Sequence, residues 1–166
     1  MQLAKELQDR TDAQLAKTEV QFARTDAKLW SIGVNIGQTA EEFFYYSLES
    51  TLKLGNLKFD YTSSNIGNRK KEIEDEFDIV MYNGDSVALI EIKHKVHPSD
   101  IEDLINRKVT NFRLLFPEYK DYKIYLGIGG MSVTKDIESK AKNEGIAVLR
   151  QKGEIAYIDA NYLKVY

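Results

Sequence analysis

The chain has 166 residues, a formal net charge of -3 and no cysteine. This length allows one domain of ordinary size plus an appendage, and the missing cysteines exclude disulfides, zinc–thiolate sites and thiol nucleophiles. The first residues mix charges and no apolar run approaches membrane-spanning length, so we expect a soluble cytoplasmic protein. Nucleic-acid-binding proteins usually carry a basic surplus. The charge therefore argues mildly against nucleic acid, unless a divalent metal and a local basic patch supply the positive charge.

Residues 9–30 repeat with a period of seven. Leu or Phe recurs at one position and Thr four residues before it, as Leu15, Phe22, Leu29 and Thr11, Thr18, Thr25. This spacing is typical of a coiled-coil seam with Leu or Phe at position a and Thr at position d. A weak seam of three repeats needs a partner helix, most simply its own copy in a homodimer or higher oligomer. A frayed, solvated helix is the alternative.

Two glycines, Gly33 and Gly37, interrupt the helical register after the heptads. We assign residues 1–32 to the heptad-repeat coiled-coil helix and residues 33–166 to a second domain. That domain begins with an amphipathic helix predicted over residues 38–53.

The helix over residues 38–53 carries an acidic residue on its apolar side. Its apolar stripe consists of Ala40, Phe44, Leu48 and Leu52. Glu41 falls inside this stripe, and a carboxylate on a buried helix face needs a partner. A metal site would supply one, and a backbone amide or a lysine is the alternative.

The rest of the chain predicts strands and helices. Residues 57–61 form a short strand candidate, whereas the polar residues 62–74 predict a loop. Two β-rich runs flank the hairpin signal Asn83-Gly84. In chain order the further predicted elements are strands at 76–82 and 87–95, a helix to about 115 from Ser99 or Asp100, a strand at 123–128, a helix at 132–144, and strands at 146–150 and 154–158. This order predicts an α/β fold with a mixed sheet and helices on its faces.

The hairpin between the two β-rich runs brings three charged residues together. A two-residue turn places Asp78 diagonal to Glu91, and a four-residue loop places the two directly opposite each other. Either loop leaves both carboxylates on one face, roughly 5–8 Å apart, where they can bridge one cation. Lys93, two residues after Glu91, shares that face.

Glu91 and Lys93 follow a strand run that is apolar on both faces. Placing charges there costs several kcal/mol each unless they are paired or bind an ion. Escape to solvent, or a simple salt bridge, is the alternative. The register with Asp78 favours a functional site.

The order of these motifs resembles that of the PD-(D/E)XK nuclease superfamily. The likeness rests on Gly37-x-x-x-Glu41, on Glu-Phe-Asp ending at Asp78, and on Glu91-Ile92-Lys93 after a tight turn. It extends to an uncharacterised prokaryotic branch in which Thr-Asp-x-x-Leu heptads precede the nuclease domain, and it covers almost the whole chain. Phe77 stands where the superfamily often has proline. The resemblance implies a restriction-endonuclease-like mixed β-sheet flanked by helices and preceded by a coiled-coil helix.

The resemblance also implies Mg²⁺-dependent hydrolysis of phosphodiester bonds in DNA, with Mn²⁺ as an alternative metal. Asp78, Glu91 and the carbonyl of Ile92 would bind the metal. Lys93 would orient or deprotonate the attacking water. Glu41 would hold a second metal or a water ligand.

The basic triplet Arg69, Lys70 and Lys71 lies in the predicted loop before Asp78 and would bind phosphate, or is simply a solvated loop. A second function from a different class stays open: a catalytically silent DNA-binding or protein-interaction module of the same fold, oligomerised through the coiled coil. The acidic balance favours this module, and the intact set of charged hairpin residues favours the nuclease.

Overall fold

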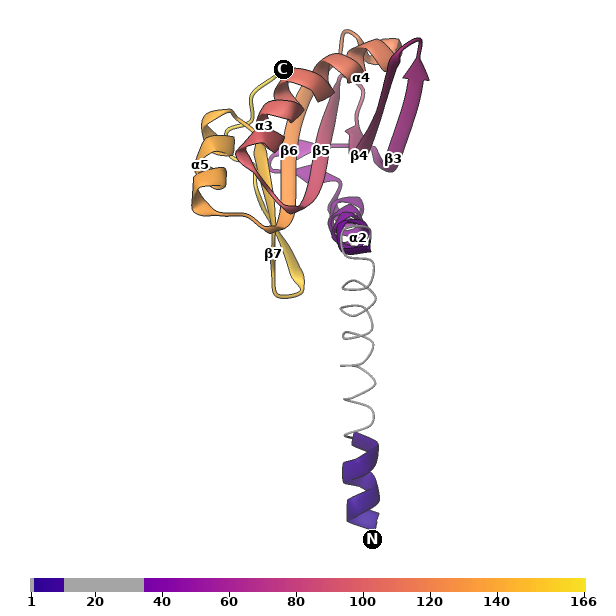
Figure 1. Ribbon diagram of the computed structural model, residues 1–166, viewed down its shortest axis with the longest axis vertical. Coiled ribbons are helices and arrows are strands. Elements are labelled where there is room, and N and C mark those ends of the chain that lie inside the picture. Colours follow the sequence, from indigo (N-terminus) through magenta and orange to yellow (C-terminus); the bar gives the residue numbers. More distant parts are fainter. Residues whose placement is uncertain (1, 11–34) are drawn as a thin grey trace. The chain divides into compact units, whose positions relative to one another are not determined.

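The computed structural model describes residues 2–10 and 35–166 (Figure 1). The chain divides into two compact units, Met1–Gln38 and Thr39–Tyr166. The domain boundary predicted between residues 32 and 33 lies outside the described residues and stays a prediction. Within the described ranges, no helix combines the length and the apolar character needed to cross a membrane.

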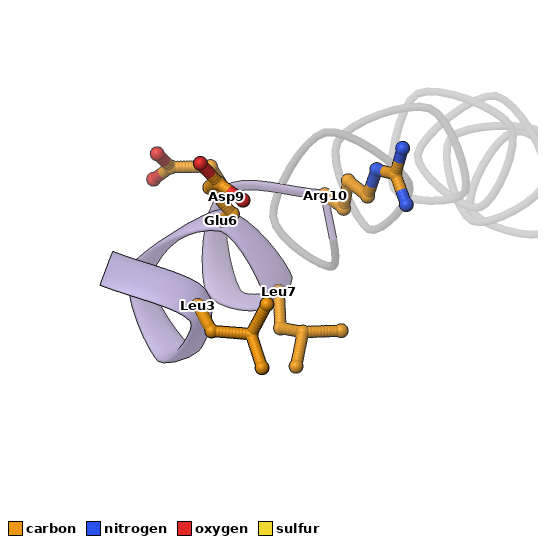
Figure 2. A pocket seen from close by; sticks show the side chains of 5 residues that line it. All are labelled: Leu3, Glu6, Leu7, Asp9 and Arg10. Atoms are coloured by element: carbon orange, nitrogen blue, oxygen red, sulfur yellow. The ribbon is translucent and has the colours of Figure 1, made fainter. Parts of the chain in front are cut away.

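Residues 2–10 form a helix with exposed side chains. Leu3 and Leu7 lie together on one side of this helix, away from Glu6 and Asp9 (Figure 2). These four residues and Arg10 line a hollow. The predicted seam lies outside the described residues, at Thr11, Leu15, Thr18, Phe22, Thr25 and Leu29. An N-terminal helix is therefore present, whereas the coiled coil and its dimer stay predictions.

Six strands of the unit Thr39–Tyr166 form one mixed sheet, in the order β3-β4-β5-β6-β7-β8. They are β3 (Tyr61–Lys70), β4 (Ile73–Tyr82), β5 (Ser86–Lys95), β6 (Lys123–Ser132), β7 (Ala147–Lys152) and β8 (Ile155–Asp159). The central strands β5, β6 and β7 are parallel, and the other pairings are antiparallel. Two short strands, β1 (Lys53–Leu54) and β2 (Leu57–Lys58), form a separate ribbon. The predicted class, an α/β fold with a mixed sheet flanked by helices, is confirmed.

Helices cover both faces of this sheet. The helices are α2 (Asn35–Thr51), α3 (Pro98–Asp103), the π-helical segment η1 (Leu104–Lys108), α4 (Val109–Leu115), the short 3-10 helix η2 (Pro117–Tyr119) and α5 (Lys135–Asn143). On one face, Phe44 of α2 packs in a core with Ile79 and Ile90. On the other face, Phe112 of α4 packs in a core with Leu89. Burial of these apolar surfaces on both faces holds the strands in place. It therefore also fixes the positions of the strand ends that carry the candidate site.

The hairpin between β4 and β5 has the longer of the two predicted loops. Tyr82 lies opposite Val87 and Ile79 opposite Ile90, so residues 83–86 form a four-residue loop. The Asn83 side chain holds this loop, because its Oδ1 accepts hydrogen bonds from the backbone N–H groups of the two residues that follow Gly84. An Asn side chain that mimics a backbone turn is a common way to set such a loop.

The predicted loop over residues 62–74 is wrong, because most of it is strand β3. Except for Asn65, residues 62–70 pair with β4, and both faces of β3 are largely exposed. An edge strand that is solvated on both sides needs no apolar alternation, so its polar sequence carried no strand signal. The remaining predicted helices and strands are present, with ends shifted by up to four residues.

Candidate metal and catalytic site

Asp78 lies where β4 and β5 separate. Their ladder ends at the pair Ile79–Ile90, and the same register carried one residue further places Asp78 opposite Glu91. Beyond this point Asp78 Oδ2 accepts a hydrogen bond of 2.8 Å from the backbone N–H of Ile92. A carboxylate therefore bonds to a backbone group at the end of the ladder and lies between the two strands.

The alternation of β4 is interrupted at this residue. Phe77 and Val80 are three positions apart, yet both pack in the core that contains Phe112. Strict alternation would place them on opposite faces. Across the strand pair, Asn65 of β3 has a positive φ of 51° and stands in the gap of the β3–β4 register beside Asp78. Asp78 therefore lies at a local irregularity of the sheet, and the expectation that it shares one face with Glu91 stays a prediction.

Glu91 is buried, with 7% of its side chain exposed. Its Oε1 atom has no hydrogen-bond partner and lies 3.5 Å from Lys108 Nζ. Burial and the neighbouring Asp78 charge raise the pKa of Glu91 to about 9, against the opposing charges of Lys108 and Lys93. A buried carboxylate with one unpartnered oxygen has spare capacity for a cation.

Glu41, on α2, interacts with the Asp78 carboxylate. It is half-buried on the helix side that also carries the buried Ala40 and Phe44, as the sequence predicts. Burial and the charge of Asp78 raise the pKa of Glu41 to about 7, and the charge of Lys93 opposes this. Asp78 therefore interacts with Glu91 and with Glu41, and the three predicted acids converge.

Lys93 lies two residues after Glu91 on β5, opposite Gly130 of β6, and is partly exposed. Its positive charge lowers the pKa of both Glu41 and Glu91, which places the ammonium group within electrostatic reach of both acids. The four residues that we predicted as catalytic, Glu41, Asp78, Glu91 and Lys93, are thus electrostatically coupled, and their roles stay predictions.

A second lysine, Lys108, belongs to this neighbourhood and was missed from the sequence. Its side chain is 9% exposed, and Nζ lies 2.7 Å from Asp75 Oδ1. It also donates to the Glu76 carbonyl and lies 5.0 Å from the centroid of the Phe77 ring. Arg107 and Asn111 each donate at 2.8 Å to the other oxygen of Asp75.

The Asp75 carboxylate is the centre of this network. Burial raises its pKa, but hydrogen bonds from Lys108 and Asn111 outweigh burial and hold that pKa below its usual value. A signal for Lys108 was present in the sequence, because Leu104, Lys108 and Phe112 are spaced by four residues on one helix side. The stripe argument that identified Glu41 applies equally to this lysine.

The donor set is suited to magnesium. Within residues 2–10 and 35–166, no group of three or more His, Cys, Asp or Glu side chains is arranged to hold a metal ion. Asp78, the unpartnered oxygen of Glu91 and the Ile92 carbonyl would supply only part of a coordination shell. Mg²⁺ is commonly bound by one or two carboxylates and fills its octahedron with water and substrate phosphate. The residues present therefore fit Mg²⁺ better than a metal that needs an all-protein cage.

The basic triplet lies at the end of β3 and the start of the turn that follows, outside this cluster. Arg69 and Lys70 end β3, and Lys71, with a φ of 58°, begins the turn into β4. All three are exposed. Lys70 lies opposite Ile73, five residues before Asp78, which corresponds to roughly 17 Å along the strand.

Comparison with known proteins adds little to this geometry. No protein-family model and no curated protein matches the chain. One similar crystal structure is the protein of unknown function AF1548, with a TM-score of 0.43, 16% identity, and coverage of 66% of this chain and 58% of that one. Another is protein VC1899 from Vibrio cholerae, with a TM-score of 0.46, 13% identity, and coverage of 75% and 32%.

A third similar structure is the small subunit of the heterodimeric restriction endonuclease R.BspD6I. Its TM-score is 0.39 and its identity 14%, over 78% of this chain and 72% of that one. The present chain spans 58% and 32% of the length of the first two proteins. At this level of similarity, function has to be argued from the site itself.

Proposed function

We propose that the chain is a Mg²⁺-dependent nuclease of the cytoplasm that hydrolyses phosphodiester bonds in DNA through a restriction-endonuclease-like domain. The single observation that carries this proposal is the electrostatic coupling of Asp78, Glu91 and Glu41 beside Lys93, with a buried Glu91 oxygen that accepts no hydrogen bond. Three acids crowded together disfavour their own ionised forms, and a divalent cation removes that cost.

Each residue has a role that its position supports. Asp78 and Glu91, with the Ile92 carbonyl, would hold Mg²⁺, or Mn²⁺ in its place. The bound metal would polarise a phosphoryl oxygen and lower the pKa of water. Lys93 would orient or deprotonate that water and offset negative charge on the phosphate. Glu41 would bind a second metal or a water ligand from the α2 side.

The hydrogen bond from Ile92 N–H to Asp78 fixes one carboxylate oxygen, and Asp78 would bind the metal through the other. A ligand held by a backbone donor is aimed with little rotamer freedom, which lowers the entropic cost of metal binding. Lys108 forms ion pairs with Asp75 and Glu91. It would therefore help to position Glu91 without contacting the substrate.

Substrate contact would extend beyond the acids. Arg69, Lys70 and Lys71 at the tip of the β3–β4 hairpin lie far enough from Asp78 to meet a phosphate several nucleotides from the scissile bond. A homodimer through residues 9–30 would present two such sites, one for each strand of a duplex. Both features belong to the proposal.

A catalytically silent binding module of the same fold is the second candidate, and the net charge of -3 favours it. The two differ in chemistry, because only the nuclease needs both metal and Lys93. The test is to incubate the full chain with plasmid, linear and branched DNA in Mg²⁺, Mn²⁺ or EDTA. We expect cleavage of at least one form with either metal and none in EDTA. Binding of DNA without cleavage in either metal would establish the silent module instead.

A further inference from the structure

A cleft of about 320 Å³ lies beside the end of β6 and the hairpin formed by β7 and β8. The hairpin extends beyond the end of the sheet (Figure 1). Its lining consists of Met131, Val133, Arg150, Gln151, Lys152 and Tyr157. Two cations and an aromatic ring thus meet in one hollow.

The strand register connects this cleft to the site described above. Lys93 lies opposite Gly130, Gly130 opposite Arg150, and Arg150 opposite Tyr157. These four residues form one row across β5, β6, β7 and β8. Neighbouring strands lie about 4.8 Å apart, so the Cα atoms of Lys93 and Arg150 are on the order of 10 Å apart. That is roughly three nucleotides at 3.4 Å per nucleotide.

The row faces the same side of the sheet as Glu91. On β5, β6 and β7, the residues two positions before Lys93, Gly130 and Arg150 are Glu91, Ile128 and Val148, which also lie opposite one another. Ile128 and Val148 pack in the core beneath α4 and α5, and residues two apart on a strand share a face. Lys93 and Arg150 therefore project on this face too. Gly130 between them carries no side chain, and the buried Val96, from the segment after β5, packs over it.

Two groups of the lining remain exposed, the Tyr157 ring and Lys152. Arg150 bonds to Glu138 at 2.5 Å through one terminal nitrogen, yet its buried Nε has no hydrogen-bond partner. Its guanidinium lies 5.1 Å from the centroid of the Tyr157 ring, and Tyr157 is still 47% exposed. Lys152 and Gln151 are exposed at the rim. Glu138 offsets the charge of Arg150, and Lys152 keeps the lining positive.

We propose that this cleft is a nucleotide subsite that binds an unpaired DNA segment next to the scissile phosphate. Lys152 and Arg150 contact its phosphates, and Tyr157 stacks on one of its bases. Bases inside a duplex are stacked on each other, so an exposed aromatic ring beside cations fits a single strand better than a duplex. The inference rests on the proposed function and narrows its substrate to DNA with a single-stranded segment.

The test is fluorescence anisotropy with a labelled single-stranded oligonucleotide and a labelled duplex. Ca²⁺ replaces Mg²⁺ so that the probes stay intact. The variants are Tyr157→Ser and Lys152→Glu. Lys123→Glu is the matched control, because Lys123 is an exposed lysine at the opposite end of β6. Thermal melting and Mg²⁺ titration of each variant show that the fold and the acidic site are intact.

We expect Tyr157→Ser to weaken single-strand binding about tenfold, as the loss of one stacked base predicts, with duplex binding unchanged. Lys152→Glu weakens both, and Lys123→Glu weakens neither. The inference is overturned if wild type binds no single strand, or if Tyr157→Ser binds it as tightly as wild type. Binding through Tyr157 without cleavage of any DNA would refute the nuclease proposal alone. Cleavage that is insensitive to Tyr157→Ser and Lys152→Glu would refute the subsite alone.

Discussion

Lys108 Nζ lies 3.5 Å from Glu91 Oε1 and 2.7 Å from Asp75 Oδ1, so one buried ammonium group stands between two acids. Its hydrogen bonds go to Asp75 and to the Glu76 carbonyl, whereas Glu91 Oε1 accepts none. The ammonium group therefore offsets the cost of burying the Asp75 charge better than it offsets the cost of burying the Glu91 charge. This asymmetry leaves Glu91 as the acid with an oxygen available to a metal.

Glu91→Gln should stabilise the metal-free protein and change its response to pH. The pKa of Glu91 in the folded chain is about 9, above its ordinary value of 4.5, so the folded state holds a proton that the unfolded state releases. Stability of wild type in EDTA therefore falls as pH rises through this window, by up to about 1.4 kcal/mol per pH unit. Urea denaturation at pH 6 and pH 8 should show a smaller fall for Glu91→Gln. The exposed Glu42→Gln is the control, and an equal pH slope in wild type and Glu91→Gln would refute the assignment.

Magnesium should raise the melting temperature of wild type. A ligand that binds only the folded state stabilises it by mass action, by roughly 2.7 kcal/mol when its concentration is a hundred times the dissociation constant. The shift should vanish in Glu91→Gln, which keeps the shape of the side chain but lacks the charge. An unchanged melting temperature of folded wild type up to millimolar Mg²⁺ would count against a metal site.

Lys108→Met should destabilise the protein far more than Lys140→Met. Removing Lys108 takes the ammonium partner from the buried Asp75, which keeps Arg107, so we expect a loss of about 2–3 kcal/mol, below the roughly 3–5 kcal/mol of a fully uncompensated buried charge. Lys140 forms an exposed pair with Glu102, worth about 1 kcal/mol or less. Chemical denaturation of the two variants measures the difference. Similar losses for both would show that the buried network contributes little.

Assembly should depend on the heptads. If Leu15, Phe22 and Leu29 form a seam, the full chain is a dimer or higher oligomer and a chain starting at Ser31 is a monomer. Leu15→Asp with Phe22→Asp should dissociate the oligomer without unfolding the remaining domain. Light scattering at tens of micromolar separates these states. A monomeric full chain at that concentration would show that the heptads do not drive oligomerisation.

Sequence reasoning predicted the fold class because its signals were local. Buried strands such as β5 are apolar, and the Asn83-Gly84 hairpin left only two registers to consider. Strand β3 gave no such signal, since an exposed edge strand is defined by pairing with β4 rather than by its own side chains. Long-range pairing of that kind is not encoded in a short window of sequence.

The placement of the candidate site residues was predictable where periodicity decides which side a residue faces. Glu41 followed from the apolar stripe of its helix, and Glu91 with Lys93 from strand alternation. The position of Asp78 was harder to predict from the sequence, because the break in strand alternation there depends on Asn65 of the neighbouring strand β3. Lys108 was missed because its partner Asp75 lies 33 residues away in sequence.

The most direct test of the nuclease proposal compares DNA cleavage and Mg²⁺ binding in wild type, Lys93→Ala and Asp78→Asn. Asparagine keeps an oxygen that can accept the hydrogen bond from Ile92, so that variant should stay folded. We expect wild type to cleave DNA in Mg²⁺ and both variants to lose cleavage by at least about a hundredfold. Calorimetric titration should find Mg²⁺ bound by wild type and Lys93→Ala but not by Asp78→Asn. Cleavage by Lys93→Ala at the wild-type rate, or Mg²⁺ binding undiminished in Asp78→Asn, would contradict the account.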